Sequence, residues 1–279
     1  MTSPFFLIDV FSSAPFNGNP LAVIVANDLP TDEMQTITRW LNLSETTFLM
    51  PPIDPAADYR VRIFAQDREM PFAGHPTLGT CQAWLSQGGQ PKNGNAIIQE
   101  CGAGLVRIRR DGERLAFAAP PLIRSGPVSV AEREEFAAIL RIDASNIVDA
   151  QWADNGPGWV AVRLATAAEV LALTPLGSYP RTVDIGVVGP HPVGSETAFE
   201  IRTFFSDQFG NLHEDPITGS FNASAAQWLL HEGLAKTPYV VAQGTKLDRA
   251  GRAYINQDET GQVWVGGDAR VLFEGRTTW

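Results

Sequence analysis

One pattern of residues occurs twice in this chain, and the two copies stand half a chain apart. Residues 58–80 align with residues 198–220 without a gap, at a shift of 140 positions (62 to 202), in a chain of 279 residues. The matched positions include charged, aromatic and turn-forming residues: Arg62 with Arg202, Phe64 with Phe204, Asp67 with Asp207, Pro76 with Pro216 and Gly79 with Gly219. A match with so long a period indicates two similar units rather than a solenoid of many small repeats.

The two copies differ at one position that carries chemistry. His75 in the first copy aligns with Asp215 in the second. If the two halves pack about a pseudo-twofold axis, an imidazole and a carboxylate face each other across the seam. We therefore expect an active site at that place.

The composition limits the kinds of partner that the protein can have. The formal net charge is −10, with 44% hydrophobic and 19% charged residues. This is an ordinary globular mixture, and its acidity makes nucleic acid or an anionic membrane a poor candidate partner. The first residues, MTSPFFLIDVF, have neither a basic lead-in nor a long apolar run, so we expect neither a signal peptide nor a membrane span. Cys81 and Cys101 form no CxxC pair, which favours reduced thiols and a cytoplasmic location.

Hydrophobic patterning predicts an α+β fold. Short runs rich in β-branched and aromatic residues predominate, as in residues 59–64 and 199–205, and predict many strands. Two helices should follow the repeated motifs, at about 77–85 and 219–230, and a sheet wrapped around each would bury its apolar length. Capping boxes at Ser129–Glu132 and Thr166–Glu169 predict two further helix starts.

The boundary between the two domains should lie in residues 119–128, a stretch with three prolines. We place the N-terminal lobe at 1–122 and the C-terminal lobe at 123–279, and leave open whether the last strand returns to the N-terminal lobe.

Each repeated motif has the form x-Pro-x-x-Gly-[Ser/Thr] and should begin a helix. The first amides of a helix lack internal partners and carry a partial positive charge. Two such helix starts that converge on one cleft would bind a carboxylate without lysines, which is how an acidic protein could hold an anionic metabolite. The alternative is that both motifs are simply well-capped helix starts.

Single residues in these segments also have ordinary structural explanations. Glu45 follows a predicted helix and could be a solvated strand-end charge, while His75 alone could be a structural hydrogen-bonding group. Asp215 alone could cap its helix. Asp9 and residues 17–20 could serve only to form the turn after the first strand. The sequence has no Walker loop, no GxGxxG after a strand, no HExxH and no GxSxG, and no third ligand joins His213 and Asp215, so we predict no metal site.

Six segments in order along the chain resemble the PhzF-like family of phenazine biosynthesis. They are DVFSSAPFNGNPLAV, LNLSETTF, PFAGHPTLGT, EDPITGSFNAS, QGTKLDRAGRAYI and VWVGGDARV, of which the third and fourth are the most specific. That family has the diaminopimelate-epimerase fold. The resemblance therefore implies an α+β protein of two pseudo-symmetric domains, each a β-barrel-like sheet around a central helix.

The resemblance also implies an activity and a set of site residues. It implies an isomerase without cofactor or metal, which moves a proton between two carbon atoms of a small unsaturated carboxylic acid and works as a homodimer. Glu45 would be the proton-transfer group, with His75 and Asp215 as further catalytic residues. The positions expected to hold the substrate are Asn19, Ser44, Gly74, Thr218, Gly219 and Ser220. Burial of Glu45 in a closed cleft beside another carboxylate would raise its pKa toward neutrality.

Two departures from related proteins bear on the chemistry. Epimerases of this fold use a pair of cysteines at the helix starts, whereas Cys81 and Cys101 lie elsewhere, so two-thiol racemisation is disfavoured. Phe221 follows Ser220 where many family members have a small residue, and we expect its bulk to reshape the pocket. Two other functions stay open: an epimerase or racemase with carboxylate bases acting on an amino-acid-like substrate, and a non-catalytic binder of small molecules.

Overall fold

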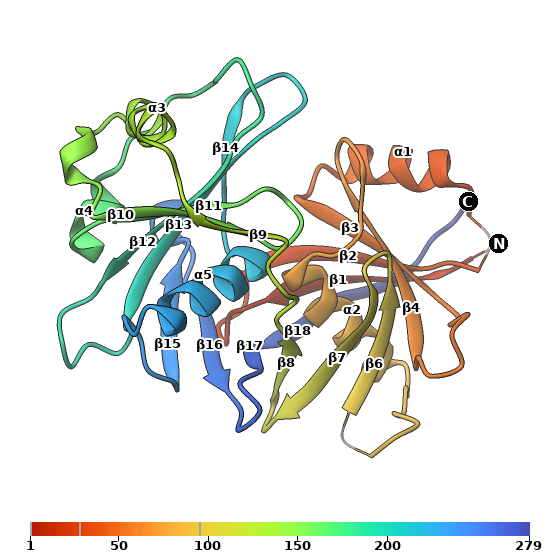
Figure 1. The fold of residues 1–279 in the computed structure, drawn as a ribbon. Helices are drawn as coiled ribbons and strands as arrows, with labels where there is room; N and C mark the ends of the chain where they lie inside the picture. Colours follow the sequence, from red (N-terminus) through yellow and green to blue (C-terminus); the bar gives the residue numbers. More distant parts are fainter. Residues whose placement is uncertain (1, 28, 95) are drawn as a thin grey trace. The chain divides into compact units, whose positions relative to one another are not determined.

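The computed structural model describes residues 2–27, 29–94 and 96–279 and divides the chain into two compact units. Unit 1 contains the residues up to Ala118 together with Gly266–Trp279, and unit 2 contains Ala119–Val265 (Figure 1). The chain passes back into unit 1 inside strand β17 (Val263–Gly267), so the last strand, β18 (Ala269–Arg276), belongs to the N-terminal unit, where it pairs with β1.

Unit 1 is a sheet with two helices. Its strands are β1 (Pro4–Val10), β2 (Asn19–Val25), β3 (Glu45–Met50), β4 (Tyr59–Ala65), β5 (Glu69–Met70), β6 (Ala96–Cys101), β7 (Gly104–Asp111) and β8 (Arg114–Ala118), and its helices are α1 (Thr31–Leu41) and α2 (Gly74–Ser86). Pairing runs β18–β1–β2–β3–β4–β6–β7–β8. The pairs β2–β3 and β4–β6 are parallel, and each is connected by a segment that contains a helix, as a parallel pair requires.

Unit 2 repeats this connectivity. Its strands are β9 (Arg124–Pro127), β10 (Asp149–Asp154), β11 (Val160–Arg163), β12 (Asp184–Pro190), β13 (Phe199–Ser206), β14 (Leu212–Asp215), β15 (Tyr239–Gln243) and β16 (Gly251–Gln257). Its helices are α3 (Val130–Leu140), α4 (Ala167–Ala172) and α5 (Gly219–His231), with 3₁₀ turns η1 (Ala144–Asn146) and η2 (Thr245–Leu247). The parallel pairs are β11–β12 and β13–β15, whose connections carry α4 and α5. The predicted α+β fold of two similar domains is confirmed.

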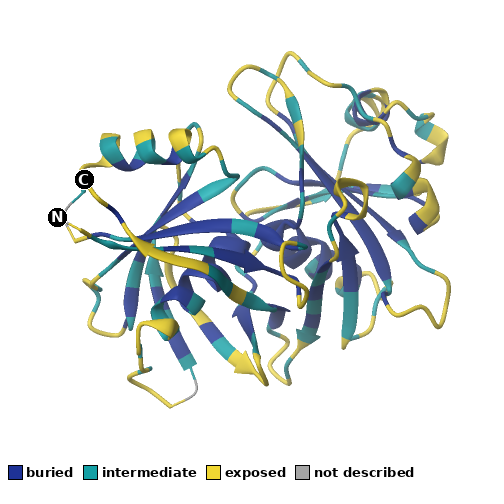
Figure 2. Cartoon of the chain, turned by 180° about the vertical axis from the view of Figure 1, so that it is seen from behind, coloured by how far each residue is buried: buried dark blue, intermediate teal, exposed yellow. Residues whose placement is uncertain are grey.

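The central helix of each unit is buried on nearly all sides. In α2 every residue from Gly74 to Cys81 is buried, and in α5 every residue from Gly219 to Ala226 is buried. The strands β1, β2, β3, β4, β8 and β18 all contact α2. Exposed residues lie instead on loops, on outer helices such as α1 and on outer strands such as β7 and β18 (Figure 2). No helix in the described ranges is long and apolar enough to cross a membrane.

The close packing of α2 against the sheet explains why residue 79 is a glycine. A Cβ atom at Gly79 would stand 2.5 Å from Cδ2 of Leu21 and 3.1 Å from Cγ2 of Val10, so the glycine lets α2 lie close against β1 and β2. The motif predicts that Gly79 removes side-chain bulk where another group approaches closely, and this is confirmed in the second turn of α2.

The two helix starts are offset from the gap-free sequence match. Helix α2 begins at Gly74, three residues before the predicted start, whereas α5 begins at Gly219 as predicted; both have 13 residues. Equivalent helix positions are thus 145 apart (74 to 219), not 140, because hairpin β13–β14 is longer than β4–β5. By position in the helix His75 corresponds to Ser220, and the pairing of His75 with Asp215 as equivalent residues is wrong.

The capping boxes of the two outer helices of unit 2 are present as predicted. Ser129 Oγ accepts from the Glu132 amide and Glu132 accepts from the Ser129 amide, which begins α3. Thr166 and Glu169 make the same reciprocal pair at the start of α4. These local signals predict helix starts well because both partners lie within four residues.

The repeated arginine of unit 1 joins a strand hairpin to a helix. Arg62 makes a bidentate contact with Glu69, at 2.6 and 2.8 Å, and donates to Thr31 Oγ1 at 3.0 Å at the start of α1. Its guanidinium also lies 5.1 Å from the ring centroid of Phe64. The side-chain exposures of Arg62 and Glu69 are 17% and 40%, so water screens the pair.

The repeated arginine of unit 2 has the same arrangement at greater depth. Arg202 makes a bidentate contact with Glu214, at 2.7 and 2.9 Å, and lies 5.0 Å from the ring centroid of Phe204. It donates to the carbonyl oxygens of Val170 and Leu173 at the end of α4. Arg202 is 5% exposed and Glu214 12%, so this pair is a buried copy of the pair in unit 1.

This difference in burial predicts unequal effects of the same substitution. Arg202→Met should lower the free energy of unfolding by about 3–5 kcal/mol, because it leaves the buried Glu214 carboxylate without its partner. Arg62→Met should cost about 1 kcal/mol or less, since its pair is solvent-screened. Urea unfolding of both variants measures the two losses, and equal losses would contradict the argument from burial.

Candidate active site

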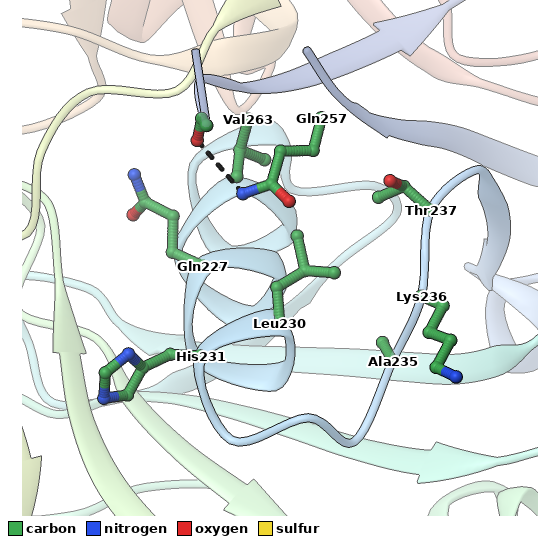
Figure 3. A pocket seen from close by; sticks show the side chains of 9 residues that line it. Gln227, Leu230, His231, Ala235, Lys236, Thr237, Gln257 and Val263 are labelled. Carbon is green, nitrogen blue, oxygen red and sulfur yellow. Dashed lines mark hydrogen bonds between the residues drawn. The ribbon is translucent and has the colours of Figure 1, made fainter. Parts of the chain in front are cut away.

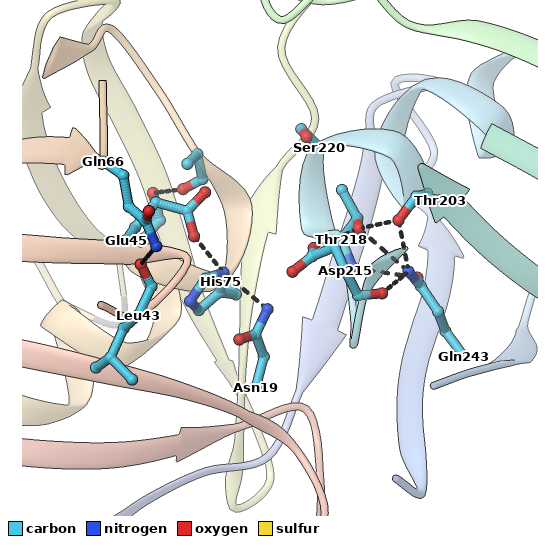
Figure 4. A network of polar contacts seen from close by, with 12 residues as sticks. Asn19, Leu43, Glu45, Gln66, His75, Thr203, Asp215, Thr218, Ser220 and Gln243 are labelled. Carbon is cyan, nitrogen blue, oxygen red and sulfur yellow. Dashed lines mark hydrogen bonds and ion pairs between the residues drawn. The ribbon is translucent and has the colours of Figure 1, made fainter. Parts of the chain in front are cut away.

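Glu45 is the first residue of β3 and is held there by the turn that precedes it. Helix α1 ends at Asn42, which has a left-handed backbone with φ of 56°. The Gln66 side chain, from the β4–β5 turn, donates to Asn42 Oδ1 at 3.1 Å and to the Leu43 carbonyl at 3.3 Å (Figure 4). The turn from α1 into β3 is thereby fixed, and it includes Ser44, which is half-buried.

Three polar side chains from separate segments of unit 1 meet at the start of α2. His75, the second residue of α2, is 3% exposed, and its Nδ1 lies 3.5 Å from Glu45 Oε2. The amide nitrogen of Asn19, the first residue of β2 and fully buried, lies 3.4 Å from the same Nδ1 (Figure 4). A hydrogen bond of 2.8 Å between the hydroxyls of Thr80 and Thr47 ties α2 to β3.

The imidazole of His75 is neutral at physiological pH. Burial lowers its pKa to about 3, against a smaller opposing effect of a backbone hydrogen bond at Pro20. The contact with Glu45 is therefore not a pair of opposite charges near neutral pH. Nδ1 of a neutral imidazole is either a donor or an acceptor. If Asn19 donates to it, Nδ1 is the acceptor, and Glu45 can form a hydrogen bond to it only as the protonated acid.

This pKa predicts a loss of stability in acid. Unfolded, His75 titrates near its ordinary value of 6.5, so below that pH the unfolded chain binds a proton that the folded chain does not. The free energy of unfolding should thus fall as the pH drops below 6.5, by about 2 kcal/mol at pH 5 from this group alone. His75→Gln should lose less stability than the wild type between pH 7.5 and pH 5 in urea titrations. Identical losses would show that His75 titrates normally.

Asp215 belongs to a hydrogen-bonded group at the start of α5. It ends β14, is 8% exposed, and accepts a hydrogen bond of 2.5 Å from Thr218 Oγ1. Thr218 is the N-cap residue of α5, and its hydroxyl also lies 2.6 Å from that of Thr203 on β13. One oxygen of the carboxylate is thus oriented by a buried hydroxyl.

Gln243 connects this group, and the sequence did not identify it as a site residue. It is 1% exposed, and its Nε2 donates to the hydroxyls of Thr203 and Thr218 and to the Asp215 carbonyl, at 3.0–3.2 Å (Figure 4). Its Oε1 accepts from the Thr218 amide at 3.1 Å and from Asn222 at 2.9 Å. The available signal was a glutamine at the end of the apolar strand YVVAQ, which opens the QGTKLDRAG segment.

Ser220, the second residue of α5, is held by the loop between β10 and β11. Its Oγ accepts a hydrogen bond of 3.0 Å from Trp159 Nε1, and its carbonyl accepts one of 2.9 Å from Asn155 Nδ2. All three residues are less than 8% exposed. Asn155 and Trp159 were not predicted, because contacts with residues more than 60 positions away leave no local pattern.

Phe221 does not have the expected place. It is fully buried, and its ring fills the space above Gly186, where a Cβ atom would lie 2.1 Å from the ring. It also packs edge-on against Trp159, with ring centroids 5.5 Å apart. The expectation that its bulk reshapes a pocket is wrong, because the residue after the helix start points into the core of unit 2.

The predicted site residues thus form one group in each unit. Glu45, His75 and Asn19 meet in unit 1, and Gly74 begins the helix that carries His75. In unit 2 Thr218 is hydrogen-bonded to Asp215 and stands directly before Gly219 and Ser220. The expectation that both groups line one cleft stays a prediction.

The cysteines have the properties of inert thiols. Cys81 lies inside α2, where burial raises its pKa to about 12, and burial also raises the pKa of Cys101 at the end of β6. Both thiols therefore stay protonated near neutral pH and are poor bases. This supports the expectation that the chemistry does not use a pair of thiols.

A separate cavity lies at the other end of α5. It has a volume of about 530 Å³ and is lined in part by Gln227, Leu230, His231 and Lys236 (Figure 3). Gln257 and Gly261 also line it, and the Gln257 side chain donates to the Gly261 carbonyl at 3.1 Å. No predicted site residue lines this cavity, so it does not coincide with either group.

Comparison with known proteins gives the family. The family model for phenazine biosynthesis-like proteins, PhzC-PhzF, matches residues 8–275. The chain is 35% identical to antisense-enhancing sequence 1 of Schizosaccharomyces pombe, with 97% of each chain covered, and 30% identical to trans-2,3-dihydro-3-hydroxyanthranilate isomerase of Pseudomonas aeruginosa, with 98% of each covered. It superposes on a predicted epimerase from Pseudomonas aeruginosa with a TM-score of 0.80, 26% identity and 99% of each chain covered. The chain belongs to the PhzF-like family of isomerase- and epimerase-like proteins, whose fold it shares.

Proposed function

We propose that the protein is an isomerase that moves a proton between two carbon atoms of a small unsaturated carboxylic acid, with Glu45 as the proton-transfer group. The observation that carries this proposal is the contact of Glu45 Oε2 with Nδ1 of a buried, neutral imidazole at 3.5 Å. A neutral imidazole lowers the pKa of a neighbouring carboxylate less than a permanent cation at the same distance would.

The reaction would need only acid–base steps. Glu45 removes a proton from a carbon that is activated by the substrate's acid group, the electron pair shifts along the conjugated system, and Glu45 returns the proton to a second carbon. No electrons are gained or lost, and one carboxyl group serves as base and then as acid. If Asn19 donates to Nδ1, the hydrogen of the neutral imidazole stands on Nε2, from which His75 could donate to the charge that develops on the substrate.

The helix starts support binding of the substrate's acid group. The N-cap residues Ala73 and Thr218 make no side-chain hydrogen bond to the first turns of the described helices α2 and α5. Those first-turn amides, at Gly74 and at Gly219 and Ser220, carry the partial positive charge of the helix end. Asp215, oriented by Thr218, would accept a hydrogen bond from an amino or hydroxyl group of the substrate.

Trans-2,3-dihydro-3-hydroxyanthranilate is the first compound to test, because a relative of 30% identity has a name that assigns this isomerisation to it. The proposal for this chain is the substrate class, a small conjugated amino or hydroxy acid. The assay therefore includes a panel of such acids in deuterated water, followed by NMR.

The central prediction concerns Glu45. Glu45→Gln should reduce turnover by about a thousandfold, within the range found for a well-placed acid–base group, because the amide cannot accept and return a proton. The dissociation constant of a carboxylic acid that binds in the site should change only a few-fold. The matched control is Glu113→Gln, at an exposed site in the turn between β7 and β8, which should behave as wild type. Full activity of Glu45→Gln would defeat the assignment.

The same assay separates two other functions. Deuterium at one stereocentre without a shifted double bond would indicate an epimerase, which the description of one structural relative as a predicted epimerase favours. A ligand that binds tightly but is never converted by the wild type would indicate a non-catalytic binder. A shifted double bond agrees with the proposal, and the new carbon can carry either deuterium or the substrate's own proton, since Glu45 returns the proton that it removed.

A further inference from the structure

We propose that the β10–β11 loop of unit 2 is a substrate-recognition element, in which Trp159 is a positioning residue that fixes the hydroxyl of Ser220 as a hydrogen-bond donor to an anionic ligand. This inference deepens the proposed function and rests on it for the substrate class. The loop is residues 155–159, with sequence NGPGW.

Hydrogen bonds and two glycines fix the conformation of this loop. Asp154 Oδ1 accepts hydrogen bonds from the amides of Gly156 and Gly158, at 2.7 and 2.8 Å, and both glycines have positive φ values, 142° and 108°. The Ala153 amide donates to the Trp159 carbonyl at 3.0 Å and closes the loop. Positive φ is readily adopted only by glycine, so the sequence specifies this loop conformation.

The direction of the Trp159 hydrogen bond decides what Ser220 can do. An indole N–H can only donate, so it occupies a lone pair of Ser220 Oγ. The hydroxyl hydrogen of Ser220 then remains available for an acceptor, and donation to the oxygen strengthens the hydroxyl as a donor. A hydroxyl fixed in this way suits a carboxylate better than an ammonium or an amide N–H. It stands in the first turn of α5, where the helix end also favours an anion.

The packing beneath Trp159 keeps the indole in place. Its ring lies edge-on against Phe221, and Phe221 fits only because residue 186 is a glycine. Trp159 is 4% exposed and Phe221 is fully buried. The indole therefore has little freedom to turn its N–H away from Ser220.

Asn155 supplies a second, independent observation. It is 7% exposed and its Nδ2 is bonded to the Ser220 carbonyl, but its Oδ1 is buried with no hydrogen-bond partner within the described part of the chain. A buried acceptor without a donor is costly and indicates a group that arrives with a ligand. The loop would thus accept an N–H or O–H of the substrate at Asn155 Oδ1, close to where Ser220 donates to its carboxylate.

The test is a double-mutant cycle on ligand binding. The probe is 3-hydroxyanthranilate, a stable aromatic analogue of the proposed substrate class, titrated calorimetrically. Trp159→Phe keeps the ring and removes the N–H, and should raise the dissociation constant about five- to tenfold, within the usual effect of one neutral hydrogen bond. Ser220→Ala should weaken binding by a similar factor. Adding Trp159→Phe to Ser220→Ala should cause little further loss, because the indole acts through the hydroxyl.

The matched control is Trp264→Phe. Trp264 is also in unit 2 and 3% exposed, and its indole N–H donates to Asp258 at 2.8 Å, in the turn between β16 and β17. This variant should bind the probe as wild type does. Thermal melts of all variants exclude loss of folding as the cause of weaker binding.

Ligand chemistry gives a further readout that a merely structural role would not change. Wild type should prefer 3-hydroxyanthranilate over its carboxamide, and Trp159→Phe should lose most of that preference. Equal effects of Trp159→Phe with and without the Ser220 hydroxyl, or an unchanged preference, would overturn the proposal. Turnover is measured separately through Glu45→Gln, so failure of the isomerase assignment and failure of this binding role can be told apart.

Discussion

Burial of an entire helix inside the sheet of each unit is the constraint on which the other features depend. Helices α2 and α5 are buried from their first residues onward, so their first amides and the side chains near them are removed from bulk water. Buried polar groups require partners, and each helix start consequently has a dense polar neighbourhood. Unit 1 supplies Asn19 and Glu45 around His75, and unit 2 supplies Gln243 and two threonines around Asp215.

The same burial decides the charge state of the site. An imidazole that is 3% exposed is kept neutral, while the Asp215 carboxylate accepts a hydrogen bond from the Thr218 hydroxyl. The bidentate ion pairs of the repeat, at Arg62 and Arg202, lie instead where a hairpin meets an outer helix. These arginine pairs of the repeat are thus distinct from the polar groups at the starts of α2 and α5.

Sequence alone predicted those features that depend on local patterns or on the repeat. The two similar domains, the capping boxes at Ser129 and Thr166 and the helix starting at Gly219 were predicted correctly. The start of α2 was placed three residues too late, because Pro76 was taken to mark the helix entrance and lies instead inside the first turn. Gln243, Asn155 and Trp159 were missed as site residues, because their role depends on contacts between distant segments, which no spacing rule encodes.

The two central helices start 145 residues apart, whereas the sequence match has a shift of 140, and this difference of five residues gives a reason why two similar units can have different chemistry. The second residue of the central helix is His75 in unit 1 and Ser220 in unit 2. The first contacts a carboxylate from β3, and the second is bonded by an indole from the β10–β11 loop. The longer β13–β14 hairpin brings Asp215 to the strand end before α5, a place for which the short β5 of unit 1 provides no equivalent carboxylate. With such unequal helix starts the two units of a duplicated fold present different groups there, an imidazole beside a carboxylate in unit 1 and a hydroxyl beside an indole in unit 2.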